Sequence, residues 1–357
     1  MVSESLDLEV SNTRFQTTWL SPTYKCNNGC WWCYAGGSSP DKEMPIERVN
    51  EILKLLNKLG AKRLILVGGE PTVYSELEDL LSTATGLGIS TGMVTNGRKL
   101  SDYKFTKSLK DKGISGIGIT ILGSEDIHDR LTKVNGSYRE TIEGIMKCKE
   151  LGIDVTTNTV ITEHNKDDLT YILELSDSLG IRRCFFNVCS DDISNPHDYS
   201  LSPLRAVEIV RDFLLKNESH HSKIRIVTPM AICNFEDHAD DFLKKGLIGG
   251  SCGAFYGNIF AIDYNGDVLP CPHFTGFPIF NLFESMKLMG AAEFREIFLG
   301  RGNAGESFRS KLWHYPSTSC VDSDKYGESC LGGCPIQWLK YNPEENIRGG
   351  KKNEKFS

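Results

Sequence analysis

The sequence predicts an α/β fold, in which an open, partial (βα)6 barrel is followed by a small α+β domain with a β-hairpin. Two observations indicate the barrel. Short runs rich in Val, Ile, Thr and aromatic residues alternate with segments whose apolar residues recur at helical spacing. A glycine stands shortly before most of these runs, where it would end the preceding helix in the left-handed conformation. Alternating strands and helices of this kind build a parallel sheet.

Six runs are predicted to be the parallel strands of the barrel: 16–24, 63–67, 89–95, 116–121, 154–161 and 182–188. Each is short and rich in residues that favour strands. Six units are fewer than the eight of a closed barrel, so we expect an open barrel. Its site should lie at the C-terminal ends of the strands.

The segments between these strands are predicted to be helices. Ile52, Leu55 and Leu56 form one apolar face in the first of them. Helix ends are expected at Gly60, Gly88, Gly113, Gly152 and Gly180. Ser75 and Glu78 have the spacing of a capping box at the start of another helix.

The chain is predicted to divide at about residue 229. We expect an N-terminal extension over 1–14, the barrel over 15–229, a cysteine-bearing domain over 230–345 and a basic tail over 346–357. In the cysteine-bearing domain, Asn265-Gly266 is typical of the turn of a β-hairpin.

Composition and charge exclude several classes of protein. The chain is 39% hydrophobic and 24% charged, which is close to the globular average and excludes disorder and coiled coil. A net charge of −7 provides no attraction to nucleic acid or to an anionic membrane. There is no signal peptide and no apolar run of the roughly 18 residues that a membrane span needs. We therefore expect a cytoplasmic protein, in which twelve cysteines indicate metal or catalytic use.

Three cysteines follow the first strand, in the order Cys26-Asn-Asn-Gly-Cys30-Trp-Trp-Cys33. Thiolates so close in sequence can converge on one inorganic centre, and Gly29 allows a tight loop. A zinc loop is one alternative, although structural zinc takes four protein ligands and no fourth is nearby. A four-iron cluster on three thiolates would leave one iron open to an outside ligand.

The second strand ends in Gly68-Gly69-Glu70-Pro71. Two glycines at a strand end allow close approach of a ligand, and Glu70 offers a carboxylate to an ammonium group. Alone, this run would indicate a turn. Together with the cysteine loop, it favours a ligand site.

The cysteine loop and the Gly-Gly-Glu-Pro run resemble the radical S-adenosylmethionine (SAM) family. The resemblance implies that Cys26, Cys30 and Cys33 hold a [4Fe-4S] cluster whose open iron binds SAM. It also implies that Gly68, Gly69, Glu70 and Pro71 meet the methionyl amine and that Trp32 lies near the adenine. Further SAM contacts implied by position are Thr120, Lys133 and Asn158. For Thr120 and Asn158, plain packing within a strand is the alternative.

The C-terminal region resembles the SPASM/twitch auxiliary-cluster extension of the same family. Cys252, Gly266 and Cys271 fit its opening motif, and Cys330-Leu-Gly-Gly-Cys334 fits its closing motif. The middle CxxC has only its first member, Cys320, and no cysteine follows Cys334.

These departures imply one auxiliary [4Fe-4S] cluster, with Cys252, Cys271 and Cys334 as ligands and either Cys320 or Cys330 as the fourth. A second, partly ligated auxiliary cluster is the alternative. The remaining cysteines are interpreted as buried small residues: Cys148, Cys184, Cys189 and Cys233.

The resemblance implies a radical SAM oxidoreductase or maturase. It would cleave SAM reductively to a 5′-deoxyadenosyl radical, which would take a hydrogen atom from the substrate. An auxiliary cluster that accepts an electron or anchors the substrate favours oxidation or cross-linking. In relatives that mature sulfatases an aspartate base follows the cysteine that corresponds to Cys271; here Pro272 and His273 follow, which disfavours that reaction.

A peptide or protein side chain is the preferred substrate, and a nucleoside, sugar or other small metabolite is the alternative. Only 25 residues precede Cys26, so a peptide would need direct groove binding or a separate recognition protein. A reductant such as flavodoxin or ferredoxin is the expected partner. A non-catalytic iron–sulfur redox protein is the remote alternative.

Overall fold

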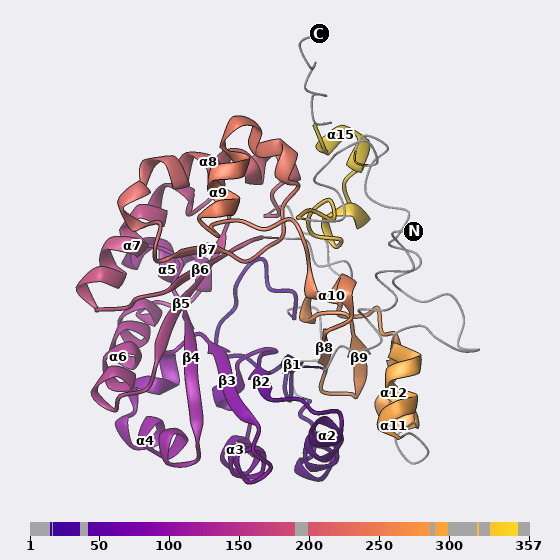
Figure 1. Ribbon diagram of the computed structural model, residues 1–357. Coiled ribbons are helices and arrows are strands. Elements are labelled where there is room, and N and C mark those ends of the chain that lie inside the picture. Colours follow the sequence, from indigo (N-terminus) through magenta and orange to yellow (C-terminus); the bar gives the residue numbers. More distant parts are fainter. Residues whose placement is uncertain are drawn as a thin grey trace.

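The computed structural model describes residues 15, 17–35, 42–189, 199–285, 290–298, 320 and 329–348. A single curved sheet passes through this part of the chain, and helices cover its outer side (Figure 1). The expected N-terminal extension and most of the expected basic tail lie outside the described residues. No helix in the described ranges is long and apolar enough to cross a membrane.

Ten strands form the sheet, in the order β10-β9-β8-β1-β2-β3-β4-β5-β6-β7. The six predicted strands are confirmed: β1 (Thr17–Leu20), β2 (Arg63–Leu66), β3 (Ser90–Thr95), β4 (Ile114–Thr120), β5 (Val155–Ile161) and β6 (Cys184–Val188). Each of them pairs in parallel with the next. Their C-terminal ends therefore meet at one edge of the sheet, as expected for successive βα units.

Two further parallel strands extend this six-stranded core. β7 (Ile224–Ile226) pairs with β6, and β8 (Ile259–Ile262) pairs with β1. β9 (Asp267–Leu269) and β10 (Phe280–Asn281) continue the sheet in antiparallel fashion. The predicted hairpin is confirmed as β8–β9, with Gly266 at a φ of 90°. β7 is too short to give a periodic signal, and the pairing of β8 with β1 joins segments far apart in the chain.

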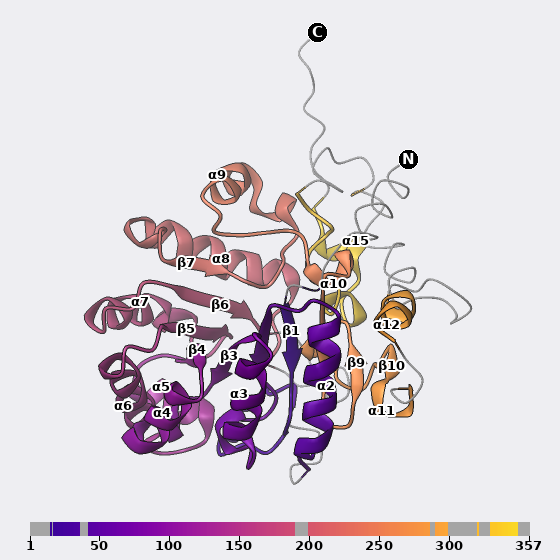
Figure 2. The same cartoon turned by 60° about the horizontal axis from the view of Figure 1, so that its bottom comes forward.

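The predicted helices cover the outer side of the sheet (Figure 2). They are α2 (Ile46–Lys58), α3 (Leu77–Gly86), α4 (Tyr103–Asp111), α5 (Glu125–Thr132), α6 (Ser137–Glu150), α7 (Leu169–Ser178) and α8 (Pro203–Lys216). The later helices are α9 (Ala239–Lys244), α10 (Gly253–Tyr256), α11 (Leu282–Ser285), α12 (Ala291–Phe298) and α15 (Pro343–Asn346). Short 3-10 helices are η1 (Pro71–Val73), η2 (Arg98–Ser101), η3 (Lys166–Asp168), η4 (Glu218–His220), η5 (Ile232–His238), η6 (Pro272–Phe274) and η7 (Gln337–Leu339).

Glycine ends the helices as predicted, whereas the predicted capping box is wrong. The five glycines named above all have φ between 63° and 96°, a region in which other residues are strained. α3 begins at Leu77 with Glu76 as its N-cap, so Ser75 lies one residue too early to cap it. The Ser75 hydroxyl instead donates to Glu43 Oε2 at 2.9 Å.

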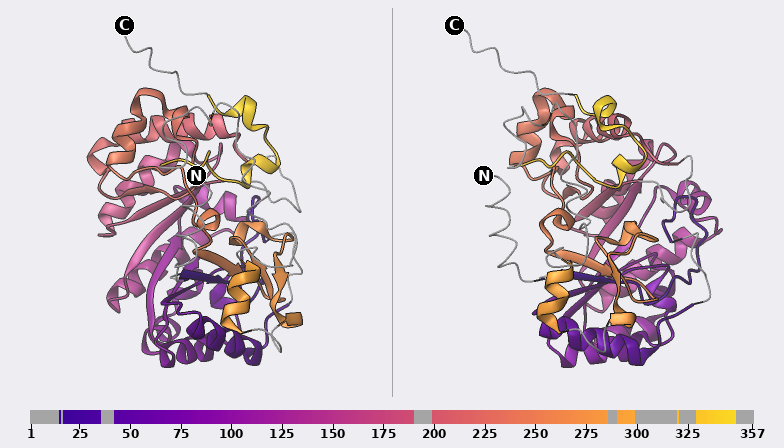
Figure 3. Two further views of the ribbon diagram at one scale, coloured as in Figure 1. Left: turned by 45° about the vertical axis from the view of Figure 1, so that its right-hand side comes forward. Right: turned by 90° about the vertical axis from the view of Figure 1, so that its right-hand side faces the viewer.

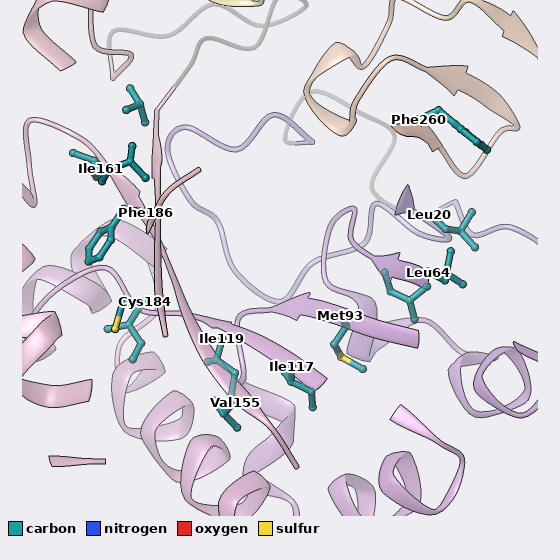
Figure 4. Close-up of a cluster of buried hydrophobic side chains, with 14 of the residues drawn as sticks. Leu20, Leu64, Met93, Ile117, Ile119, Val155, Ile161, Cys184, Phe186 and Phe260 are labelled. Atoms are coloured by element: carbon teal, nitrogen blue, oxygen red, sulfur yellow. The ribbon is translucent and has the colours of Figure 1, made fainter. Parts of the chain in front are cut away.

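Alternation along the strands separates the two sides of the sheet. In β5, Val155, Thr157, Thr159 and Ile161 are buried, and the residues between them are half-buried. Figure 4 shows part of the apolar core, with side chains such as Ile117 and Val155 on the neighbouring strands β4 and β5. The helices α4 and α6 pack against β4, and Ile117 belongs to the same apolar core as these helices. The buried residues of the strands therefore face the helices, and the half-buried residues between them face the inner side of the curved sheet.

An aromatic cluster fixes α12 against the sheet. The ring of Phe294, from α12, lies 5.0 Å from Phe260 of β8, 5.9 Å from Phe15 and 5.4 Å from Phe280. Phe294 is fully buried. These ring contacts connect Phe15, which lies just before β1, to β8, the strand that pairs with β1.

Phe294→Ala should lower the free energy of unfolding by about 3–5 kcal/mol, because it removes a buried ring and leaves a cavity. Met146→Ala is the matched control, since Met146 is 57% exposed on α6. Urea denaturation followed by circular dichroism measures both variants. Equal midpoints for the two would contradict the packing role of the aromatic cluster.

Candidate functional site

The cysteine loop begins just after β1, and its stem runs beside the end of β2. Three backbone hydrogen bonds join them: Val67 N to Leu20 O at 2.9 Å, Gly69 N to Thr23 O at 3.0 Å and Glu70 N to Lys25 O at 2.8 Å. The ladder between β1 and β2 thus continues past the strand ends, up to the residue before Cys26. This arrangement places the first cysteine at the C-terminal edge of the sheet.

Gly68 and Gly69 make this close approach sterically feasible. A Cβ on Gly69 would lie 2.2 Å from the Lys25 carbonyl oxygen, and one on Gly68 would lie 2.4 Å from that of Thr23. Gly68 also has a φ of 119°, which disfavours any side chain. The sequence indicated close approach of a ligand at these glycines, and the structure places the stem of the cysteine loop against them.

The Glu70 carboxylate joins the ends of β2 and β3. It is 1% exposed. Oε1 accepts hydrogen bonds from Thr72 N at 2.9 Å, Thr72 Oγ1 at 2.7 Å and Thr95 Oγ1 at 2.5 Å, and Oε2 accepts one from Asn96 N at 2.7 Å. A carboxylate has about four acceptor positions, so the chain itself occupies much of this capacity. Glu70 therefore holds two strand ends together beside the cysteine loop.

Asn96 and Arg98 hold the cysteine loop from the end of β3, and the sequence analysis did not identify them. Asn96 Nδ2 donates to Asn27 Oδ1 at 2.6 Å. Arg98 donates to the Asn27 carbonyl and, at 3.0 Å, to Asn28 Oδ1, and it forms an ion pair with Glu140 at 2.5 Å. The available signal was their place in the chain, directly after a parallel strand, where barrel enzymes position functional groups.

The three thiols of the loop lie close enough to influence one another. Cys26 is exposed, whereas Cys30 and Cys33 are half-buried. Burial, followed by the charges of Cys33 and Cys26, raises the pKa of the Cys30 thiol. Thiolates gathered in this way need a compensating positive centre, and a metal ligand must be deprotonated. The donor set therefore fits a thiolate-bound iron–sulfur cluster.

In the described ranges, no three His, Cys, Asp or Glu side chains surround a position for a single metal ion. A four-iron cluster is wider than one ion and holds its thiolates further apart. The chemistry and grouping of the three thiols fit a cluster of this size.

The C-terminal end of α5 packs on the cysteine loop. Gly29 N donates to Thr132 O at 2.9 Å. Lys133 has a left-handed backbone, with a φ of 59°, and its Nζ lies 3.5 Å from the centre of the Trp31 ring. Trp32 is buried in a small cluster that also contains Leu122 and Leu131. Lys133 and Trp32 thus both lie at the cysteine loop.

Thr120 and Asn158 are register partners on β4 and β5. Both are half-buried, at positions that face the inner side of the sheet. Asn187 of β6 donates from Nδ2 to Asn158 Oδ1 at 2.7 Å. Sequence reasoning missed Asn187, which has an inward position on the next strand, two residues beyond Phe185, the register partner of Asn158. These three residues form a polar row near the C-terminal strand ends.

The C-terminal cysteines fall into two groups. Burial, followed by the charges of Cys252 and Cys334, raises the pKa of Cys271 well above its usual range. Cys271 and Cys334 also pack against the same apolar cluster, which contains Ile336. The three expected auxiliary ligands therefore come together. Cys320, by contrast, belongs to a different cluster, around Ala231 and Trp338.

Tyr34 lies between the cysteine loop and the first of these groups. Its ring is 4.9 Å from that of His273, two residues after Cys271. Burial raises the pKa of Tyr34 well above its usual range, and the charges of Tyr24, Cys33 and Cys271 add to the effect. Tyr34 thus lies near Cys33 of the cysteine loop and near Cys271 of the first C-terminal group.

Glu70→Gln should lower the free energy of unfolding by about 1–3 kcal/mol, because one of the chain's own donors would then face the new amide NH2. Glu143→Gln is the control, since Glu143 is exposed on α6. Denaturation of both variants without cofactor measures the effect. A Glu70 variant as stable as the control would show that the buried carboxylate does not tie the strand ends together.

Residues 20–176 match the family model described as "Radical SAM superfamily". Fe-coproporphyrin III synthase of Methanosarcina barkeri is 29% identical over 46% of this chain and 42% of the relative. Sporulation killing factor maturation protein SkfB of Bacillus subtilis is 29% identical over 50% of this chain and 43% of the relative. Each match thus covers less than half of the relative's length.

One similar solved structure is Streptococcus suis SuiB bound to precursor peptide SuiA. It is 19% identical, with a TM-score of 0.69, over 97% of this chain and 78% of that chain. The shared fold therefore includes the cysteine-bearing C-terminal part. The part of this chain that matches the family model contains the cysteine loop, the Gly-Gly-Glu-Pro run and strands β2 to β5. Residues 20–176 of this chain therefore carry a radical SAM domain.

Proposed function

We propose that this protein is a radical SAM enzyme that oxidises or cross-links a peptide or protein side chain. One observation carries the proposal: three mutually close thiols lie in a loop whose stem is hydrogen-bonded to the Gly-Gly-Glu-Pro strand end. When bound, a [4Fe-4S] cluster and SAM supply reductive cleavage and a 5′-deoxyadenosyl radical that abstracts hydrogen.

The chain's own residues would bind and orient these groups. Cys26, Cys30 and Cys33 would hold the cluster. Backbone groups of Gly68, Gly69, Glu70 and Pro71 would meet the methionyl amine, while the Glu70 side chain keeps that strand end in place. Trp32, Thr120, Lys133 and Asn158 are the proposed contacts to the rest of SAM.

Glu70 thereby has a different proposed role from the one that the sequence suggested. Its carboxylate already accepts four hydrogen bonds from the chain. Glu70 would therefore affect SAM binding indirectly, by positioning the backbone of the Gly-Gly-Glu-Pro strand end. We assign no catalytic acid or base, and a flavodoxin- or ferredoxin-like reductant remains the proposed electron donor.

Two kinds of substrate are supported by different relatives. SkfB is a maturation protein, and SuiB was solved with a precursor peptide, which favours a peptide. Fe-coproporphyrin III synthase supports the second candidate, a small metabolite. For either substrate, the Cys252, Cys271 and Cys334 group would hold an auxiliary cluster that accepts an electron or anchors the substrate.

The Cys26/Cys30/Cys33→Ala triple variant should lose roughly four iron atoms per chain and all SAM cleavage. Iron is measured after anaerobic reconstitution, and 5′-deoxyadenosine is measured after reduction with dithionite. Cys184→Ala serves as a control because Cys184 is buried in β6. Wild-type protein that forms no 5′-deoxyadenosine would contradict the proposed chemistry.

The substrate class can be tested in cells that produce either the wild type or this triple variant. Comparative mass spectrometry should find a peptide or protein that has lost hydrogen mass only with the wild type, as expected for oxidation or cross-linking. A change confined to the metabolite fraction would instead favour the small-molecule candidate.

The Cys271→Ser/Cys334→Ser variant should still cleave SAM but lose formation of the modified product. The two replaced thiols are not among the cysteines of the loop, so the radical-forming site would keep its ligands, while the substrate would lose its electron acceptor or anchor. Parallel assays of 5′-deoxyadenosine and product provide the measurement. Product at the wild-type rate would exclude a functional role for the auxiliary group.

A further inference from the structure

Cys233, interpreted from the sequence as a buried small residue, is half-buried and lies near Cys320 and Cys330. It belongs to η5, which follows β7. It packs against the apolar cluster that contains Cys320 and Trp338. Figure 3 shows the C-terminal segment, in yellow, near this part of the chain in both views. Cys233 and Cys320 are about ninety positions apart in the chain, so no local sequence motif could have predicted this contact.

Backbone contacts hold the segments of Cys233 and Cys330 together. Met230 N donates to Gly249 O and Leu331 N to Gly250 O, both at 2.8 Å. A Cβ on Gly250 would lie 2.7 Å from Cγ1 of Ile232, the residue before Cys233, and 2.8 Å from the Cys330 sulfur. Gly250 therefore lies directly between the two segments, where only glycine fits.

Two further contacts fix the arrangement on either side of the cysteines. A Cβ on Gly333 would lie 3.0 Å from Ala231 N, so the Cys330–Cys334 loop touches the backbone just before Cys233. Asn234 is 2% exposed; its Nδ2 donates to Asn346 O and its Oδ1 accepts from Arg348 N, both at 2.8 Å. Cys233 is thus held from both neighbouring positions.

The electrostatics of Cys233 differ from those of an isolated buried cysteine. Burial raises the pKa of Cys233 to about 12, and the charges of Cys330 and Cys320 contribute to that rise. Cys148, inside α6, has its pKa raised to about 12 by burial alone. The comparison supports a group of three thiols at Cys233 and an ordinary core cysteine at Cys148.

We propose that Cys233, Cys320 and Cys330 hold a second auxiliary [4Fe-4S] cluster, for which Cys233 supplies a ligand from outside the C-terminal cysteine motif. The proposal extends the proposed function, which requires only one auxiliary cluster. It also resolves the choice between Cys320 and Cys330: both belong to the second group. The first auxiliary group then has Cys252, Cys271 and Cys334 as its thiolates.

Cys233 would supply a thiolate that the incomplete C-terminal motif lacks. The middle CxxC lacks its second cysteine, and no cysteine follows Cys334, so the motif alone leaves Cys320 and Cys330 as only two thiolates. Cys233 brings the number to three, the same number as in the SAM-binding loop. One iron of such a cluster needs a ligand other than these thiolates.

The test is the metal content and spectroscopy of the full chain after anaerobic reconstitution. The wild type and Cys148→Ala should each hold roughly twelve iron atoms, in three clusters. Cys233→Ala should lose up to about a third of the iron and acid-labile sulfide. Its electron paramagnetic resonance spectrum should lose one reduced-cluster component or gain a three-iron signal, while the component that shifts on addition of SAM remains.

Two controls keep this result interpretable. Cys233→Ser, which nearly preserves side-chain size, should show the same loss if ligation matters and packing does not. The SAM-responsive component reports that the barrel has folded. Cys233 variants with the iron, sulfide and spectrum of Cys148→Ala would overturn the proposal, and so would stoichiometric zinc in place of the third cluster. Failure of the proposed function would appear separately, as absence of 5′-deoxyadenosine from the wild type.

Discussion

The candidate site depends on the close backbone contact between the stem of the cysteine loop and the end of β2. Gly68 and Gly69 permit it, because any Cβ there would overlap the carbonyls of Thr23 and Lys25. The buried Glu70 carboxylate then joins that strand end to β3 through Thr95 and Asn96. A loop of cysteines would be mobile if it were attached only at its ends. Here three backbone hydrogen bonds and one buried carboxylate, which accepts four hydrogen bonds, hold its base.

The same sheet connects this site to the C-terminal cysteines. β8 pairs in parallel with β1, the strand that leads into the cysteine loop. Cys252 and Cys271 lie on either side of the β8–β9 hairpin, so their positions are coupled to β1 through backbone hydrogen bonds. The rings of Tyr34 and His273 are in contact between the cysteine loop and the group formed by Cys252, Cys271 and Cys334. The pairing of β8 with β1 thus brings the proposed auxiliary ligands close to the candidate site.

Cysteine grouping shows why spacing in the sequence is an incomplete guide to ligands. Cys330 and Cys334 are neighbours in one short loop, yet they lie in different groups: Cys334 beside Cys271, and Cys330 beside Gly250 and the segment of Cys233. The closing Leu-Gly-Gly run lets the chain turn between them, with Gly332 and Gly333 at positive φ. Asn234 then anchors the partner segment to residues 346–348.

The sequence by itself determined the six core strands, their helices, the glycine helix ends and the β8–β9 hairpin, because local periodicity and turn chemistry encode them. It also determined which cysteines follow β1. Only the tertiary structure decided that β8 extends the barrel sheet, that Asn96 and Arg98 hold the cysteine loop, and that the donors to Glu70 come from the chain. It alone placed Cys233 beside Cys320 and Cys330. These contacts join residues far apart in the chain, and their partners are chosen by packing and burial, which no local pattern records.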